Sequence, residues 1–158
     1  MICIAICDDE KYICNTIQTM LSNFFCKKNM EITIQQFSSG TELLQYNKTI
    51  DILFLDIQMD YINGMETARK LRNRKFKGFI IFITILKEMV FQSFEVQAYD
   101  YLLKPDNVSA VIHAEAPGSE VTVIPDSWHI FTSISPGSDI AGVPASVIRA
   151  ILFPSCNF

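Results

Sequence analysis

The sequence predicts an α/β protein in which parallel strands form a central sheet with helices on both faces. Short apolar runs alternate with amphipathic stretches along the first two thirds of the chain, as βαβ units require. The runs are almost wholly apolar, which is typical of strands buried on both faces. With 158 residues, 49% hydrophobic and 19% charged, the chain is long enough for one domain with a core and a short extension.

The first half of this pattern holds two strands and two helices. Residues 2–7 (ICIAIC) form an apolar run, and residues 11–28 follow with apolar side chains at helical spacing. Residues 31–37 are expected to form the second strand, and a short helix over 41–46 follows the Ser-Ser-Gly break at 38–40. The expected inner face of the first helix consists of Ile13, Ile17, Met20, Leu21 and Phe24.

The second half continues the alternation. Residues 50–56 are expected to form a central strand that ends on an aspartate, and a helix over 65–74 follows, with Met65, Ala68 and Leu71 inward and Arg69, Lys70 and Arg72 outward. Residues 79–84 are the fourth expected strand and 98–103 the fifth. A helix over 88–97 is expected between them. The pattern therefore gives five strand-and-helix steps that lack only a full final helix.

Beyond Pro105 the pattern stops. Residues 106–116 can form a short fifth helix before Pro117-Gly118 ends it, and the remaining tail is interrupted by prolines and glycines. Of 13 Lys and Arg and 17 Asp and Glu in the chain, residues 106–158 hold Arg149 alone against five acids. A nucleic-acid module normally carries a basic face, so DNA binding is not expected for this chain. We interpret 106–158 as an irregular tail without a recognisable domain, produced by truncation, fusion or a frame change.

Other general features limit the class of protein. The five cysteines show no CxxC pair, so buried reduced thiols are expected rather than disulfides or a zinc site. The longest apolar run is far shorter than a membrane span, and acids follow the first apolar stretch directly, unlike in a signal peptide. A cytoplasmic protein without a membrane partner is the expectation.

Polar residues stand where four of the expected strands end. Asp8 and Asp9 follow the first strand, Asp56 ends the third, Thr84 ends the fourth and Lys104 follows the fifth. In an open parallel sheet these ends share one edge, where ligands bind. Three carboxylates provide the hard oxygen ligands that suit Mg²⁺. A carboxylate can also attack phosphorus, and a lysine and a hydroxyl can stabilise the phosphoryl oxygens.

Three segments carry a specific resemblance: "ICDDE", "DILFLDIQMDYINGMETARKLR" and "IIFITILKEMVFQSFEVQAYDYLLKP". Together they resemble the receiver domain of response regulators in two-component signalling, and are most similar to receivers that precede LytTR-type DNA-binding domains. The resemblance implies a flavodoxin-like (βα)5 fold with strand order 2-1-3-4-5. It places the receiver in residues 1–105, or to about 116 with the short fifth helix.

The resemblance also implies a phosphorelay chemistry. Asp56 would accept a phosphoryl group from a phosphohistidine on a sensor histidine kinase. Asp9 would bind Mg²⁺ directly, Asp8 would bind it mainly through water, and the backbone carbonyl of Gln58 would complete the protein ligands. Such a protein is not an enzyme in the usual sense, because it catalyses only its own aspartyl phosphorylation and dephosphorylation.

Further residues would transmit the phosphorylated state. Thr84 would move toward the phosphoryl group, Lys104 would pair with it, and Tyr101 would turn inward as Thr84 moves. Gly64 would permit the backbone path into the third helix. The Lys104-Pro105 peptide would be cis, as is usual in this family.

Two further sequence features bear on a partner surface and on phosphorylation. Val90, Phe91 and Phe94 give the fourth helix more apolar surface than one buried stripe needs, so helix four and strand five could form a homodimer or partner face. Met59-Asp60 replaces the Met-Pro of many receivers and adds a negative charge that would weaken phosphorylation slightly.

Other functional classes stay open. A flavodoxin-like electron carrier would share the architecture, but three consecutive acids would repel a flavin phosphate. A haloacid-dehalogenase-like phosphatase needs two acids two residues apart after the first strand, whereas Asp8 and Asp9 are adjacent. A phosphorylation-independent binding module or a non-functional truncated remnant is the remaining alternative.

Overall fold

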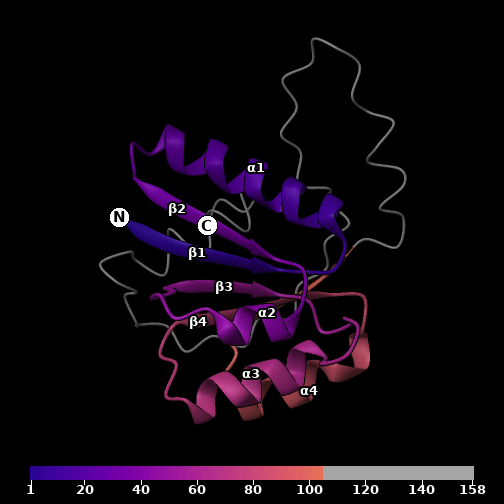
Figure 1. The fold of residues 1–158 in the computed structure, drawn as a ribbon. Helices are drawn as coiled ribbons and strands as arrows, with labels where there is room; N and C mark the ends of the chain where they lie inside the picture. Colours follow the sequence, from indigo (N-terminus) through magenta and orange to yellow (C-terminus); the bar gives the residue numbers. More distant parts are fainter. Residues whose placement is uncertain (105–158) are drawn as a thin grey trace.

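The computed structural model describes residues 1–104, and these residues form one parallel sheet flanked by helices (Figure 1). The strands are β1 (Ile2–Cys7), β2 (Ile32–Phe37), β3 (Ile52–Leu55), β4 (Phe79–Thr84) and β5 (Asp100–Leu103). Their order in the sheet is β2-β1-β3-β4-β5, and every neighbouring pair is parallel. The expected strand order is confirmed. The expected fifth helix, the Lys104-Pro105 peptide and the tail lie outside the described residues.

Helices cover both faces of the sheet. They are α1 (Lys11–Lys27), α2 (Gly40–Gln45), α3 (Gly64–Asn73) and α4 (Val90–Ser93), with one-turn 3₁₀ segments η1 (Lys87–Met89) before α4 and η2 (Phe94–Val96) after it. Figure 1 shows α1 on one side of the sheet and α2, α3 and α4 on the other. No helix within residues 1–104 is long and apolar enough to cross a membrane.

Each face of the sheet has its own core because successive strand residues point to opposite sides. On one face Ile4, Ile6 and Phe54 pack against α1. On the other face Ala5 and Leu55 lie with residues of α2, α3 and η2. The inward positions expected for α3 are buried, and so are Ile13, Ile17 and Leu21 of α1. Met20 and Phe24 are only half-buried, whereas Cys14 and Phe25 are buried. Hydrophobic periodicity therefore predicts both layers but not every inward residue of α1.

The fourth helix differs from the expected continuous helix over 88–97. One α-helical turn lies between two 3₁₀ turns, and Gln97 ends the segment with a positive φ of 50°. Ser93 and Val96 are the buried residues of α4 and η2. Residues i and i+3 share one face in a 3₁₀ turn and in an α-helix alike, so both side chains reach the core although the α-helical part is short.

Arg72 does not face solvent as expected. Its guanidinium group is partly buried and donates to four backbone carbonyls: Val96 O (2.8 Å), Phe76 O (2.8 Å), Gly78 O (2.9 Å) and Gln97 O (3.1 Å). The planar guanidinium has five N–H donors, which allows one side chain to satisfy several carbonyls at once. Arg72 thereby ties the end of α3 to the end of η2.

Candidate functional site

The register of β1 and β3 brings Asp8 and Asp56 side by side. Cys7 and Leu55 are the last paired residues of the two strands, so the next residue on each strand is an aspartate. The Asp56 N–H donates to Cys7 O at 2.9 Å and fixes this end of β3. Both aspartates are buried, with 3% and 4% exposure respectively. β3 ends at Leu55, one residue before the expected strand end at Asp56, so Asp56 lies just beyond the strand.

The register of β4 and β5 brings Lys104 to the same edge. Thr84 pairs with Leu103, and the Lys104 N–H donates to Thr84 O at 2.8 Å. Both side chains are buried. Asp8, Asp56, Thr84 and Lys104, which stand far apart in the sequence, therefore meet at one edge of the sheet.

The Lys104 ammonium group contacts three carboxylates. Its Nζ lies 2.6 Å from Asp56 Oδ2, 2.8 Å from Asp8 Oδ2 and 3.2 Å from Glu10 Oε1. An ammonium group has three N–H donors, so these contacts can use all of them. Sequence reasoning noted the acid at position 10 but missed its contact with Lys104. The three carboxylates in succession at 8–10 were the available signal.

Burial and charge set the protonation of this cluster. Burial raises the pKa of Asp8 to about 6, and the charge of Asp56 adds to the increase while Lys104 opposes it. Burial would lower the pKa of Lys104, but the negative charges of Asp56 and Asp8 outweigh burial, so the pKa of Lys104 is raised. Lys104 therefore stays charged at neutral pH, whereas Asp8 can accept a proton in weakly acidic solution.

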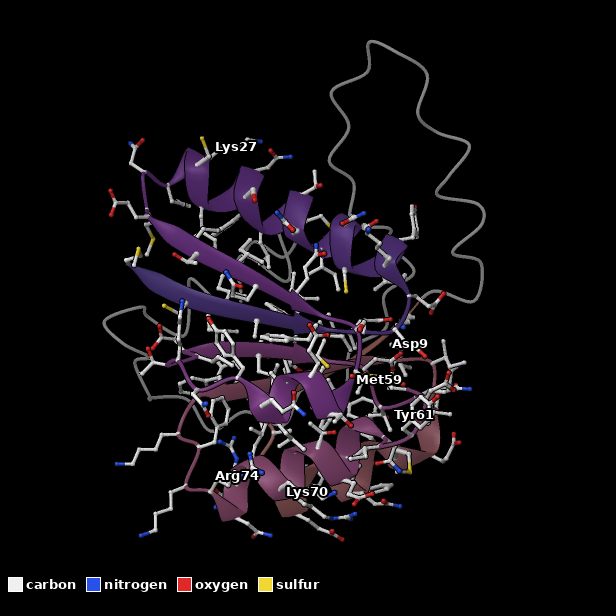
Figure 2. The ribbon with its side chains drawn as sticks, viewed as in Figure 1. Asp9, Lys27, Met59, Tyr61, Lys70 and Arg74 are labelled. Atoms are coloured by element: carbon white, nitrogen blue, oxygen red, sulfur yellow. The ribbon has the colours of Figure 1, made fainter. Side chains whose placement is uncertain are left out.

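Asp8, Asp9 and Asp56 could together hold a metal ion. Each offers one carboxylate oxygen, and the three oxygens lie within 4.8 Å of one another. Asp8 and Asp56 are buried whereas Asp9 is exposed, and Figure 2 shows Asp9 at the carboxyl end of the sheet. Two buried carboxylates and one exposed carboxylate fit Mg²⁺, which takes oxygen ligands and keeps several waters.

The loop after β3 is held against the backbone of Asp56. The Gln58 N–H donates to Asp56 Oδ1 at 3.1 Å, and the Gly64 N–H donates to Ile57 O at 2.9 Å. A Cβ atom on Gly64 would lie 1.8 Å from Asp56 O. Glycine is therefore required here by close backbone approach, which is more specific than the conformational freedom expected from the sequence.

Tyr101 and Thr84 converge on Leu86. The buried Tyr101 hydroxyl donates to Leu86 O, and the Thr84 hydroxyl accepts from Leu86 N at 3.5 Å. The rings of Tyr101 and Phe82 lie 5.9 Å apart. Burial also raises the pKa of the Tyr101 phenol. Tyr101 is therefore already inward in this structure, not in the outward position from which it is expected to turn, and Leu86 connects its hydroxyl to that of Thr84.

Comparison with known families agrees with this arrangement. The response regulator receiver domain family matches residues 4–115, which is more than half of the chain. The chain belongs to the response regulator receiver family. Receiver domains of this family act in two-component systems.

Two curated relatives illustrate the extent of the similarity. This receiver is 39% identical to Protein MrkE of Klebsiella pneumoniae over 87 residues, covering 53% of this chain and 32% of MrkE. It is 38% identical to Sensory transduction protein LytT of Oceanobacillus iheyensis over 109 residues, covering 65% of this chain and 42% of LytT. The chain therefore spans less than half the length of these two relatives. The similarity to LytT agrees with the resemblance to receivers of LytTR-type regulators.

Solved structures show the same fold. The crystal structure of the response regulatory domain of MrkE from Klebsiella pneumoniae has a TM-score of 0.58 and 30% identity to this receiver, and the match covers 70% of this chain and 89% of that one. The BeF3-activated DrrB receiver domain has a TM-score of 0.58 and 25% identity, with 71% and 92% covered. The flavodoxin-like receiver fold expected from the sequence is confirmed.

Proposed function

We propose that Asp56 accepts a phosphoryl group from a phosphohistidine of a sensor histidine kinase. The observation that carries the proposal is the contact of 2.6 Å between Lys104 Nζ and Asp56 Oδ2, in a buried cluster that also contains Asp8. A structural ion pair needs one acid for one base, whereas here a single lysine faces several carboxylates. Such an excess of buried negative charge suits a site that takes up a cation and then a phosphoryl group.

The transfer itself exchanges one bond to phosphorus for another. A carboxylate oxygen of Asp56 attacks phosphorus, the bond from phosphorus to the histidine nitrogen breaks, and the imidazole leaves with the bonding electron pair and gains a proton. Lys104 stays within reach of the Asp56 oxygens and stabilises the charge on the transferred group. Hydrolysis of the acyl phosphate later regenerates the Asp56 carboxylate.

Mg²⁺ is the proposed cofactor, with Asp8, Asp9, Asp56 and the backbone carbonyl of Gln58 as its protein ligands. Asp9 would bind directly and Asp8 mainly through water. When bound, the ion supplies positive charge to the phosphoryl oxygens. The fit rests on the three oxygens within 4.8 Å and on the hard oxygen character of every ligand in the set.

Thr84 and Tyr101 would convert phosphorylation into a change of surface. The Thr84 hydroxyl is a donor for a phosphoryl oxygen, and its movement would change the contact with Leu86 that the Tyr101 hydroxyl shares. Phosphorylation would then shift the populations of two packings of the α4 and β5 region. The receiver is proposed to occupy residues 1–105, or to about 116 with a short fifth helix, with the rest of the tail outside it and DNA binding not expected for the chain.

Intact mass spectrometry tests this proposal directly. The full chain is incubated with Mg²⁺ and acetyl phosphate beside Asp56→Asn and a chelator control. A single phosphoryl adduct that requires both Mg²⁺ and Asp56 is expected. Absence of an adduct in wild type under every condition, or an equal adduct in Asp56→Asn, overturns the proposal and favours the binding-module or remnant alternative.

A further inference from the structure

We infer that Glu10 is a positioning residue that holds Lys104 in the resting site and gives it up when a phosphoryl group arrives. The inference rests on the proposed function at Asp56. Glu10 Oε1 lies 3.2 Å from Lys104 Nζ, and the Glu10 side chain is 59% exposed. It therefore approaches the buried ammonium group from the solvent side of the cluster.

The backbone fixes Glu10 in this place. Its N–H donates to Asp8 Oδ1 at 2.9 Å, so residues 8 and 10 are held by one tight turn. Its carbonyl oxygen accepts from Ile13 N at 2.9 Å and from Cys14 N at 3.2 Å, which anchors Glu10 at the start of α1. Only the side chain is free to change partners, so a change at Glu10 need not disturb the fold.

Glu10 differs from the other two carboxylates on Lys104. Asp8 and Asp56 belong to the group of three acids whose oxygens could share a metal ion, and Glu10 does not. Asp8 and Asp56 are also buried, whereas the Glu10 carboxylate is exposed, so water competes for its charge and weakens its pair with Lys104. Among the partners of Lys104, Glu10 is consequently the one that an arriving phosphoryl oxygen can replace at least cost.

This exchange sets the direction of the expected effect. Glu10 competes with the phosphoryl group for Lys104 and also repels an anionic phosphodonor. Glu10→Gln keeps the length of the side chain and removes its charge. Because an ion pair with a solvent-exposed partner contributes on the order of 0.2–1 kcal/mol, the phosphorylation rate is expected to rise roughly 1.4- to fivefold in this variant.

The test compares wild type, Glu10→Gln and Glu31→Gln as full chains. Glu31 is an exposed acid directly before β2, at the opposite end of the strands from the site, so its substitution changes the net charge equally. The phosphorylation rate is measured by intact mass with acetyl phosphate and Mg²⁺. The ¹⁵N resonance of the Lys104 ammonium group is measured in the metal-free proteins. Glu10→Gln is expected to change both quantities, and Glu31→Gln to leave the Lys104 resonance in place with a smaller change in rate.

The outcomes distinguish failure of the Glu10 inference from failure of the proposed phosphorylation of Asp56. An unchanged Lys104 resonance in Glu10→Gln, or equal rate changes in both variants, overturns the inference while a phosphorylated wild type still supports the receiver function. A wild type that takes up no phosphoryl group overturns the proposed function itself. If Glu10 had only a structural role, Glu10→Gln would lower the stability of the protein without shifting the Lys104 resonance.

Discussion

Lys104 and Asp56 are joined by a contact of 2.6 Å, although β5 and β3, the strands that precede them, are separated in the sheet by β4. The lysine side chain crosses the end of β4 to reach the aspartate. This contact connects the ends of two strands that are not neighbours. Substitution of either residue should therefore affect both the stability of the fold and phosphorylation at Asp56.

Lys104→Met should be strongly destabilising at neutral pH. It leaves Asp8 and Asp56 buried without their cation, and loss of one partner from a buried ion pair costs about 3–5 kcal/mol. Lys104 holds the pKa of Asp8 down, so without it that folded-state pKa rises further, the folded state binds an extra proton and the loss should shrink as pH falls from 7.5 to 5. Urea unfolding at both pH values measures this. Lys70→Met, which removes an exposed pair with Glu66, is the control and should cost less than about 1 kcal/mol.

Asp8→Asn should stabilise the metal-free protein at pH 7. The folded-state pKa of about 6 lies above the ordinary value of 3.8, so the stability that Asp8 provides is fully present below pH 3.8 and is lost as pH rises through 6. An amide avoids the cost of the buried charge, which corresponds to roughly 2–3 kcal/mol. Thermal unfolding in EDTA from pH 4 to 8 should show the difference growing between 4 and 6 and constant above.

Mg²⁺ should reverse the order of stability of wild type and Asp8→Asn. It should raise the unfolding temperature of wild type at pH 7 and have little effect on Asp8→Asn, because a bound ligand stabilises only the state that binds it. Equal stabilisation of both proteins by Mg²⁺ would count against Asp8 as part of the metal site.

The sequence was sufficient for the features that depend on periodicity and strand ends. Apolar runs predicted all five strands, and the residues after those runs predicted that Asp8, Asp56 and Lys104 would meet. Their proximity follows from parallel pairing alone, because equivalent ends of parallel strands share one edge.

The sequence did not predict which polar side chains bind nearby backbone groups and which face water. Arg72 occupies a position that helical periodicity leaves outside, yet nearby carbonyls draw its guanidinium inward. The division of the fourth helix into short turns and the contact of Glu10 with Lys104 likewise depend on tertiary packing. Periodicity contains no information about such long-range partners.

Gly64→Ala should damage both the fold and the site. The added Cβ would lie 1.8 Å from Asp56 O, and this neighbour is backbone that cannot rotate away. The start of α3 or the end of β3 must shift, at a cost of about 1–3 kcal/mol or more. The free energy of unfolding in urea and the phosphorylation rate should both decrease. Asn73→Ala, an exposed change in the same helix, is the control. A stable but inactive Gly64→Ala protein would show that the displacement is confined to the site.

Phe91→Ser should reduce self-association without reducing stability. Phe91 is 79% exposed and Phe94 51% exposed, so the packed core loses little when position 91 changes. If the surface of α4 and β5 is a dimer face, burial of two such rings supplies apolar area at its centre. Light scattering after chromatography, with Mg²⁺ and beryllofluoride as phosphoryl mimic, should show a dimer for wild type and a monomer for Phe91→Ser at equal concentration. Tyr61→Ser, at a residue 99% exposed on the loop after β3, should leave the dimer intact. A wild type that stays monomeric with the mimic, or a Phe91→Ser protein that dimerises equally well, would exclude this face as the dimer interface.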